Sequence, residues 1–272
     1  MTRRRFSNSQ RFSTVCGLLM SLMIPGWMVG EPTSTAISSF NSYASAVEAR
    51  LDQQHRSEGA FFPLAPPASL NEQRLRREEM IIEQLTPRTS ADFSGALLHH
   101  WRGTTFVPEA KAADFEQLLR NFNSYPQHFS PQVLQARILT QRGDHLQIFM
   151  RVQQKHVITV VMDTTYDIAF GRLDAQHGYS TSRSTSISEI EATGTHRERA
   201  LKSNEEHGFL WRLNTYWSYE ERNGGLYLQV ESISLSRRIP VGLGWALRPY
   251  VESVPRESLE FTLRSARNAI QK

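Results

Sequence analysis

Charged residues within strand-like segments are the first candidates for chemistry in this sequence. Arg151, Asp163, Arg183, Arg212 and Glu231 each lie in the middle of a run that has the two-residue alternation of a β-strand. An unpaired buried charge is very costly, so any of these residues that face the protein interior must be paired. If they face inward, Arg183, Arg212 and Glu231 would form a paired group at the base of a cavity and could bind a carboxylate or a phenol.

The opposite orientation gives the same residues a structural role. Facing outward, they would form cross-strand ion pairs on a solvated face of a sheet, and we favour this arrangement. One β-bulge reverses the orientation of a strand, so the alternation alone leaves both arrangements open. Asp163 and Glu231 could also act as an acid and a base, although the composition gives no sign that either is perturbed.

Histidines and carboxylates elsewhere provide nitrogen and oxygen ligands without the spacing of a metal site. His99 and His100 are adjacent, and adjacent residues of a strand point to opposite faces. Glu205, Glu206 and His207 do not follow the His-Glu-x-x-His pattern. The sequence therefore predicts no metal site and no cofactor.

Hydrolase and phosphate-binding signatures are also missing. The chain contains no Gly-x-Ser-x-Gly motif, and the serine-rich residues 180–188 are typical of a polar strand face. Residues 241–250 contain two glycines but not the Lys-Ser/Thr pair of a phosphate loop. We interpret this segment as a turn before the last helix, with Trp245 and Tyr250 covering one end of a cavity or forming its gate.

Residues 1–36 have the features of an export signal. Four arginines in the first 11 positions precede an apolar stretch at 15–29 that Gly17, Pro25 and Gly26 interrupt. A spanning helix needs about 20 uninterrupted apolar residues, so an uncleaved membrane anchor is the less favoured alternative. Small residues at 34–36 or 28–30 could provide the cleavage site. We therefore expect an exported protein, periplasmic or secreted.

Removing this segment changes the charge of the chain. Residues 1–36 carry four Arg and one Glu, so a net charge of +4 on the full chain falls to +1. Nucleic-acid binding requires a basic surface, and the largest basic group that remains is Arg74, Arg76 and Arg77. The only cysteine, Cys16, also leaves with the signal. We therefore expect no nucleic-acid partner, no disulfide and no thiol chemistry.

The rest of the chain has the composition of a globular protein, with 39% hydrophobic and 10% aromatic residues. Residues 37–95 predict a helical and proline-rich extension: an amphipathic helix at 38–54, a linker at 61–67, a short helix opened by a Ser69–Glu72 capping box, and an edge strand at 80–85. Residues 96–272 predict one domain.

That domain begins with a strand at 97–107 and a helix at 110–122, broken by Pro126 and Pro131. Six strand-like runs follow with short turns, at 133–142, 145–155, 157–170, 179–191, 209–221 and 226–237. A loop at 240–249 and a helix at 255–270 close the chain. This order predicts an α+β fold in which an antiparallel sheet of about seven strands curves around one long C-terminal helix.

This order of elements resembles the START-like helix-grip superfamily of polyketide cyclases, dehydrases and lipid transport proteins. The local likeness is strongest at residues 115–129, similar to the helix, aromatic-Pro turn and second helix of coenzyme Q-binding and cyclase members, and at 254–261, where the closing helix starts. The extension before residue 97 and the insertion at 192–208 depart from the minimal family. The resemblance implies an internal cavity closed by the helix.

The resemblance therefore implies a non-catalytic protein that holds or carries a lipid, isoprenoid quinone or polyketide-like compound, with transient membrane contact as a compatible feature. A cyclase- or dehydrase-type enzyme is one alternative, and an envelope scaffold that binds a protein is another. No oligomeric state is predicted. The candidate cavity residues are aromatic or charged: Trp101, Tyr166, Arg183, Trp211, Arg212, Tyr216, Trp217, Glu231 and Trp245.

Overall fold

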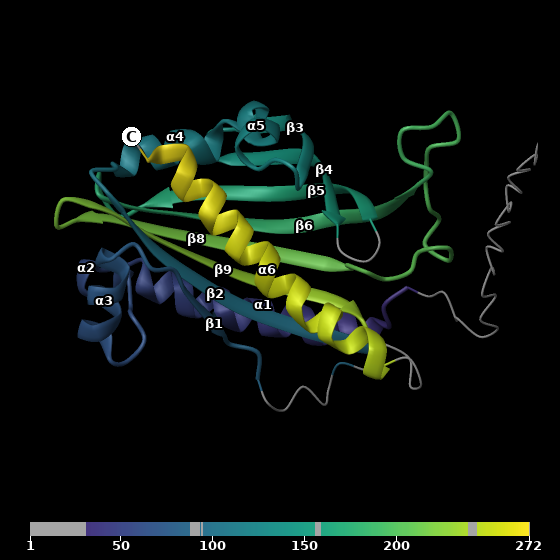
Figure 1. Cartoon of the computed structure of the whole chain (residues 1–272), viewed down its shortest axis with the longest axis horizontal. Coiled ribbons are helices and arrows are strands. Elements are labelled where there is room, and N and C mark those ends of the chain that lie inside the picture. The colour runs from purple at the N-terminus through teal and green to yellow at the C-terminus, as the bar shows by residue number, and fades with distance from the viewer. Residues whose placement is uncertain (1–30, 88–92, 94, 156–158, 239–243, 272) are drawn as a thin grey trace, which may run out of the picture.

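The computed structural model describes residues 31–87, 93, 95–155, 159–238 and 244–271, with side chains except at 244–252. One antiparallel sheet of nine strands forms its centre, in the order β1-β2-β9-β8-β6-β5-β4-β3, and β7 pairs with β6 off this path (Figure 1). The strands are β1 Ile81–Gln84, β2 Ala96–Pro108, β3 Val133–Arg142, β4 His145–Lys155, β5 Thr159–Arg172, β6 His177–Glu191, β7 Arg199–Ala200, β8 Arg212–Arg222 and β9 Gly225–Arg237.

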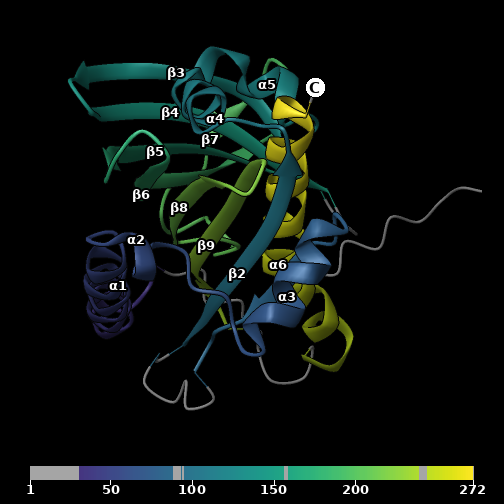
Figure 2. The same cartoon turned by 90° about the vertical axis from the view of Figure 1, so that its left-hand side faces the viewer.

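Six helices accompany the sheet within the described residues. The two long ones are α1 Ser34–Gln54 and α6 Gly244–Ile270, and they lie on opposite faces of the sheet (Figures 1 and 2). The short ones are α2 Glu58–Phe61, α3 Ala68–Arg76, α4 Ala112–Arg120 and α5 Tyr125–His128, with a 3-10 turn at Phe122–Ser124. The fold is the expected α+β helix-grip architecture, with an additional helix on the outer face.

The helix α6 packs on the inner face of the curved sheet. Leu259 and Leu263 are buried in the core between α6 and the sheet, where α6 lies mainly against β2 and β9. Gly103 of β2 permits the close approach, because a Cβ atom at this position would lie 2.9 Å from Leu259 Cδ2. The helix α4 contributes Phe115 to the same core.

The helix α1 covers part of the outer face with the stripe that its periodicity predicts. Phe40, Ala44, Val47 and Leu51 are all buried, and they pack against Leu235 and other residues of β2, β8 and β9. The side chain of Thr33 caps the helix by accepting a hydrogen bond from the backbone N–H of Ala36 at 3.1 Å. The sheet is therefore covered by a helix on each face.

Local sequence signals set several boundaries as predicted. The bounds of β3 and β4 are those expected, with Gly143 and Asp144 in the turn between them. Asn223 and Gly224 connect β8 to β9, and both have positive φ angles, 55° and 81°, as a type I′ turn requires. These turns hold adjacent strands in antiparallel register.

Three expectations about the fold are corrected. The helix α6 begins at Gly244 rather than near Pro255, because a proline removes one backbone hydrogen bond without ending a helix that is anchored by packing. The seven strands expected of the domain are present, and the edge strand expected at 80–85 is β1, but the insertion at 192–208 adds an unexpected short strand, β7, which brings the sheet to nine. The Ser69–Glu72 capping box is absent: α3 begins after Pro67, and Glu72 accepts a hydrogen bond from Tyr227 at 3.0 Å.

None of the described helices combines the length and the hydropathy that a bilayer span would need. The predicted export signal lies almost wholly in residues 1–30, outside the described part of the chain.

Candidate functional site

The predicted cavity residues divide between the two faces of the sheet. Three of them face α6, namely Trp101, Tyr166 and Trp217. Five lie on the α1 face, namely Arg183, Trp211, Arg212, Tyr216 and Glu231. Trp245 lies in the part of α6 whose side chains are not described. The candidates therefore do not line one common cavity.

The strand register explains this division, because directly paired residues of antiparallel strands share a face. In β8, Trp217 pairs with Val230 of the α6-face core. Tyr216, one position earlier, lies in the α1-face core, and Arg212 pairs with Leu235 of the same core. The alternation predicted for this strand is confirmed, and it separates residues that the cavity prediction had combined.

The α6 face is apolar and closely packed at one end of the sheet. Trp217 and Tyr219 of β8 and Leu228 of β9 are buried there against α4 and α6. Burial raises the pKa of Tyr166, on the same face, to about 12. Its phenol therefore stays neutral at physiological pH and cannot act as a base there.

The α6 face is polar toward its other end. Trp101, Ser232, Thr215 and Ser182 follow one another in register across β2, β9, β8 and β6, and all four are half-buried. The indole Nε1 of Trp101 is shielded from solvent and donates no hydrogen bond to any described residue. The α6 face thus has an apolar region at one end and a row of small polar side chains at the other. Trp101, at the edge of that row, provides a hydrogen-bond donor without a partner among the described residues.

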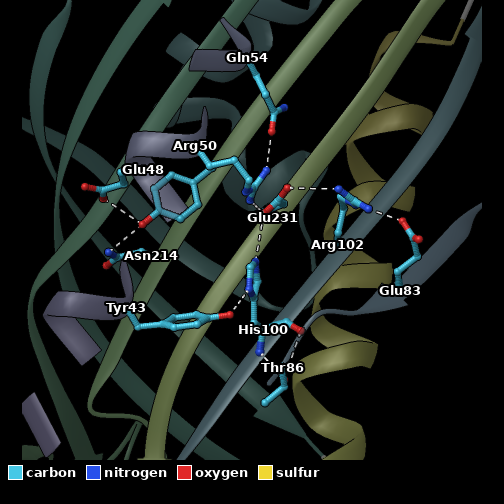
Figure 3. A network of polar contacts seen from close by, with 11 residues as sticks. Tyr43, Glu48, Arg50, Gln54, Glu83, Thr86, His100, Arg102, Asn214 and Glu231 are labelled. Carbon is cyan, nitrogen blue, oxygen red and sulfur yellow. Dashed lines mark hydrogen bonds and ion pairs between the residues drawn. The ribbon is translucent and has the colours of Figure 1, made fainter. Parts of the chain in front are cut away.

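The α1 face contains the buried carboxylate of the molecule's main polar network (Figure 3). Glu231 is 1% exposed, and its Oε2 contacts Arg50 of α1 and His100 Nε2, the latter at 3.0 Å. His100 Nδ1 lies 2.8 Å from the hydroxyl of Tyr43. A carboxylate only accepts hydrogen bonds, so in the neutral ring Nε2 donates to Glu231 and Nδ1 accepts from Tyr43.

Two arginines balance the charge of Glu231. Arg50 approaches from α1, and Arg102 Nη1 lies 3.7 Å from Glu231 Oε1 while its Nε donates to Glu83 at 3.0 Å. Burial raises the pKa of Glu231, but the hydrogen bond from His100 and the charge of Arg50 outweigh it and hold this pKa below its usual value. Glu231 is therefore ionised and paired, as a buried carboxylate must be.

The other charged candidates on this face form separate contacts. Arg183 Nε donates to Glu48 of α1 at 2.6 Å, and Glu48 also accepts from the Tyr216 hydroxyl at 2.9 Å. Arg212 donates to the backbone carbonyl of Trp211 at 2.7 Å. Arg183, Arg212 and Glu231 therefore do not form the paired group that an inward orientation would have required.

Arg151 and Asp163 confirm the prediction of a cross-strand ion pair on the outer face of the sheet. They are directly paired across β4 and β5, and Arg151 donates to both carboxylate oxygens at 2.7 and 2.9 Å. All five mid-strand charges point away from α6. The expectation of a solvated face is wrong for Glu231, however, because α1 covers it.

The residues weighed as metal ligands have other partners. His99 and His100 point to opposite faces as predicted, His99 toward Ser236 and His100 toward Glu231. Glu205 pairs with Arg199, and His207 Nδ1 contacts Glu189 at 2.7 Å. No three described His, Cys, Asp or Glu residues are grouped as a metal ion would require.

Sequence reasoning missed Tyr43, Arg50 and His100 as members of one network. The spacing of Tyr43, Val47 and Arg50 does place an arginine beside the apolar stripe of α1, which was the available signal. Their partner Glu231 is 181 positions from Arg50, and no local pattern connects them.

Comparisons with known proteins give structural likeness only. No family model matches the chain, and no curated protein sequence does either. The STAR-related lipid transfer protein from Xanthomonas axonopodis is 15% identical, with a TM-score of 0.44 over 70% of this chain and 99% of that one. The Zhui aromatase/cyclase from Streptomyces sp. R1128 is 13% identical, with a TM-score of 0.45 over 63% and 93%.

Human STARD10 is 6% identical, with a TM-score of 0.42 over 77% of this chain and 80% of its own. The helix-grip assignment rests on the strand order of this chain and on the position of α6 across its sheet.

Proposed function

We propose that this protein binds and carries an amphipathic small molecule between the sheet and α6. The observation that carries the proposal is the division of the α6 face into an apolar region and a polar row with the unsatisfied indole N–H of Trp101. Apolar burial would supply most of the affinity, and a few polar contacts would fix the orientation of the ligand.

The chemistry of this face favours a ligand with a hydrocarbon body and an oxygen acceptor at one end. The Trp101 indole donates only, so its partner must be an acceptor such as a carbonyl or hydroxyl oxygen. The side chains beside it, Ser232, Thr215 and Ser182, are small and half-buried, in contrast to the buried aromatic rings at Trp217 and Tyr219. A lipid, an isoprenoid quinone and a polyketide-like compound all satisfy these conditions.

Native mass spectrometry of the purified protein tests the proposal. We expect one small molecule per chain, released on denaturation and identified by its mass. The variant Ser232→Phe should lose it by filling the polar row, whereas Ser186→Phe, an exposed residue of the neighbouring β6, should retain it. A wild-type protein that stays free of ligand after incubation with mixed lipids and quinones would contradict the proposal.

The enzymatic alternative draws no support from the carboxylates first considered for it. Asp163 is paired with Arg151 on the outer face, and Glu231 lies under α1. Neither faces α6, so they do not provide an acid and a base for a ligand bound there.

We also propose that the protein is exported and that cleavage follows Gly30 rather than Ala36. Thr33 caps α1 and Ala36 is fully buried, so a cut after Ala36 would remove the first turn of α1. Amino-terminal sequencing of the exported protein should find Glu31 first. An unprocessed chain that stays with the membrane would instead support an anchor.

A further inference from the structure

A hollow lies on the α1 face, on the opposite side of the sheet from the proposed ligand site. It has a volume of about 610 Å³ and is bounded by α1, by Ala60 and Pro63, and by β2. This volume is within the range of about 300–1,000 Å³ that small-molecule sites occupy. The hollow adjoins the network of Glu231, so it combines space with fixed charge.

The polar lining of the hollow presents mostly hydrogen-bond donors. Arg50, Gln54 and Arg102 contribute side chains to it, whereas the carboxylates that pair with the arginines, Glu231 and Glu83, are not among its lining residues. Glu231 is buried behind the hollow, and Glu83 contacts Arg102 through Nε. The lining itself is therefore positive, although the wider network is balanced.

Several of these donors are unused. Gln54 Oε1 accepts from Arg50, but the Nε2 of the same amide is shielded from solvent and lacks a partner within the described structure. A guanidinium has five N–H groups, and the contacts found here use two of Arg50 and at most two of Arg102. A buried donor without a partner costs about 1–3 kcal/mol, so the site is suited to an acceptor.

The remaining lining is mostly apolar. Val47, Ala60, Pro63 and Leu85 contribute to the hollow, with Tyr43 at its side. Burial and the nearby charge of Glu231 raise the pKa of Tyr43, although Arg50 opposes this, and its hydroxyl proton is directed at His100. The hollow therefore offers apolar contacts beside a group of cationic donors.

We propose that this hollow is a binding site for a small carboxylate with an apolar body. Arg50, Arg102 and Gln54 would hold the carboxylate, and Val47, Pro63 and Leu85 would contact the body. A cationic ligand would meet two guanidinium groups, and an uncharged one would leave their donors unsatisfied. This site is separate from the one under α6 and does not depend on it.

Isothermal titration with probes of one chain length tests the charge requirement. The probes are octanoate, 1-octanol and octylamine at about pH 7.5, where the acid and the amine are ionised. We expect octanoate to bind at one per chain and the other two about tenfold more weakly, as charge-assisted hydrogen bonds imply. Equal binding of octanol, or no binding of octanoate, would overturn the proposal.

Two variants locate the site. Gln54→Glu keeps the acceptor for Arg50 but places a second carboxylate in the lining, so octanoate affinity should fall about tenfold or more. Gln53→Glu adds the same charge at the adjacent exposed position of α1 and should change it little. If both variants bind octanoate as the wild type does, the carboxylate binds elsewhere and the proposal fails.

A third variant keeps the test decisive if Gln54→Glu does not fold. Ala60 is exposed at the edge of the hollow, so Ala60→Phe can fill it without disturbing the core. We expect this variant to lose octanoate binding while its melting temperature stays close to that of the wild type. Retained binding in a folded Ala60→Phe protein would contradict the assignment.

Discussion

The face of the sheet under α6 and the face under α1 both bury polar groups, but they do so in different ways. Under α6 the row beside Trp101 consists of small uncharged side chains, and the Trp101 indole lacks a partner among the described residues. Under α1 a carboxylate that is 1% exposed has a histidine and two arginines around it. A buried donor without an acceptor favours the binding of a ligand that supplies one. The buried Glu231, paired with Arg50, instead holds α1 at one position on the sheet.

The comparison also shows why charge was a misleading guide to the ligand site. Buried charges are retained where a partner can be positioned, and α1 supplies that partner as Arg50. A cavity that accepts an apolar body requires the opposite, because the bound ligand would displace water from any unpaired charge in the cavity. Because the two faces bury polar groups differently, substitutions on them should have different effects, and the largest is expected at Glu231.

Removing the carboxylate of Glu231 should strongly destabilise the fold. Glu231→Ala removes the common partner of Arg50, Arg102 and the buried His100. Breaking a buried pair on one side costs about 3–5 kcal/mol, and the 39% exposure of Arg50 and the remaining Arg102–Glu83 pair place the expected loss at the lower end of that range. Urea denaturation measures this loss. The matched variant Glu205→Ala breaks the exposed pair with Arg199 and should leave the unfolding midpoint unchanged. Equal effects of the two variants would remove the distinction that we draw for Glu231.

Acid should lower the free energy of unfolding through protonation of His55, next to α1. This residue directly follows α1, and its Nε2 lies 2.8 Å from Ser218 Oγ. Burial and the charge of Arg50 lower the pKa of His55 from 6.5 to about 4, although the charge of Glu231 acts in the opposite direction. The depressed value means that its stabilisation is complete above pH 6.5 and is lost as the pH falls toward 4. The loss can reach about 3 kcal/mol.

Unfolding measured from pH 7 to pH 4 tests this sign. His55→Gln should flatten the decline, whereas His145→Gln, at an exposed position of β4, should leave it as in the wild type. A wild-type decline that persists unchanged in His55→Gln would assign the pH dependence to another group.

Trp101 should affect ligand binding more than stability. Trp101→Phe removes the unsatisfied N–H and keeps an aromatic ring, so affinity for a carbonyl- or hydroxyl-bearing ligand should fall about three- to tenfold, the value of one hydrogen bond. Trp217→Phe makes the same change in the closely packed region. We expect that control to lower the melting temperature and to affect affinity less. Titration with the ligand identified by mass spectrometry gives both affinities.

The smallest effect should come from the partly exposed pair of Arg151 and Asp163 on the outer face, which α1 does not cover. Arg151 and Asp163 retain about a quarter of their side-chain exposure, 24% and 26%. A double-mutant cycle with Arg151→Ala and Asp163→Ala should give a coupling energy below about 1 kcal/mol. A coupling as large as the effect of Glu231→Ala would mean that cover by α1 does not distinguish the two pairs.

Hydrophobic periodicity, turn residues and strand alternation predicted most helices and strands, because each of these signals depends on neighbouring residues. The stripe of α1, the turn at Asn223 and Gly224, and the alternation of Tyr216 and Trp217 all appear as expected. Proline was the exception. Pro255 predicts a helix boundary, but packing of α6 on the sheet overrides that local preference.

The site could be predicted only in part, because alternation defines two faces without saying which helix covers each. The sequence places α1 in an extension before the domain and gives no sign that its Arg50 pairs with Glu231. A register shift between Thr165 and Tyr166 further separates the alternation of β5 from that of β6. Contacts between α1 and the sheet join residues from 57 positions apart, for Tyr43 and His100, to 181 positions apart, for Arg50 and Glu231, and one sequence gives no signal for them.

Photo-crosslinking of an uncharged long-chain alcohol tests the central claim most directly, since it shows which face of the sheet binds the ligand. The alcohol would have a diazirine at mid-chain, and tandem mass spectrometry would identify the labelled residues. We predict labels on the α6 face, at Trp101, Ser232 or Leu259. Labels confined to Tyr43, Val47 and other residues of the α1 face would contradict the claim that the ligand lies under α6.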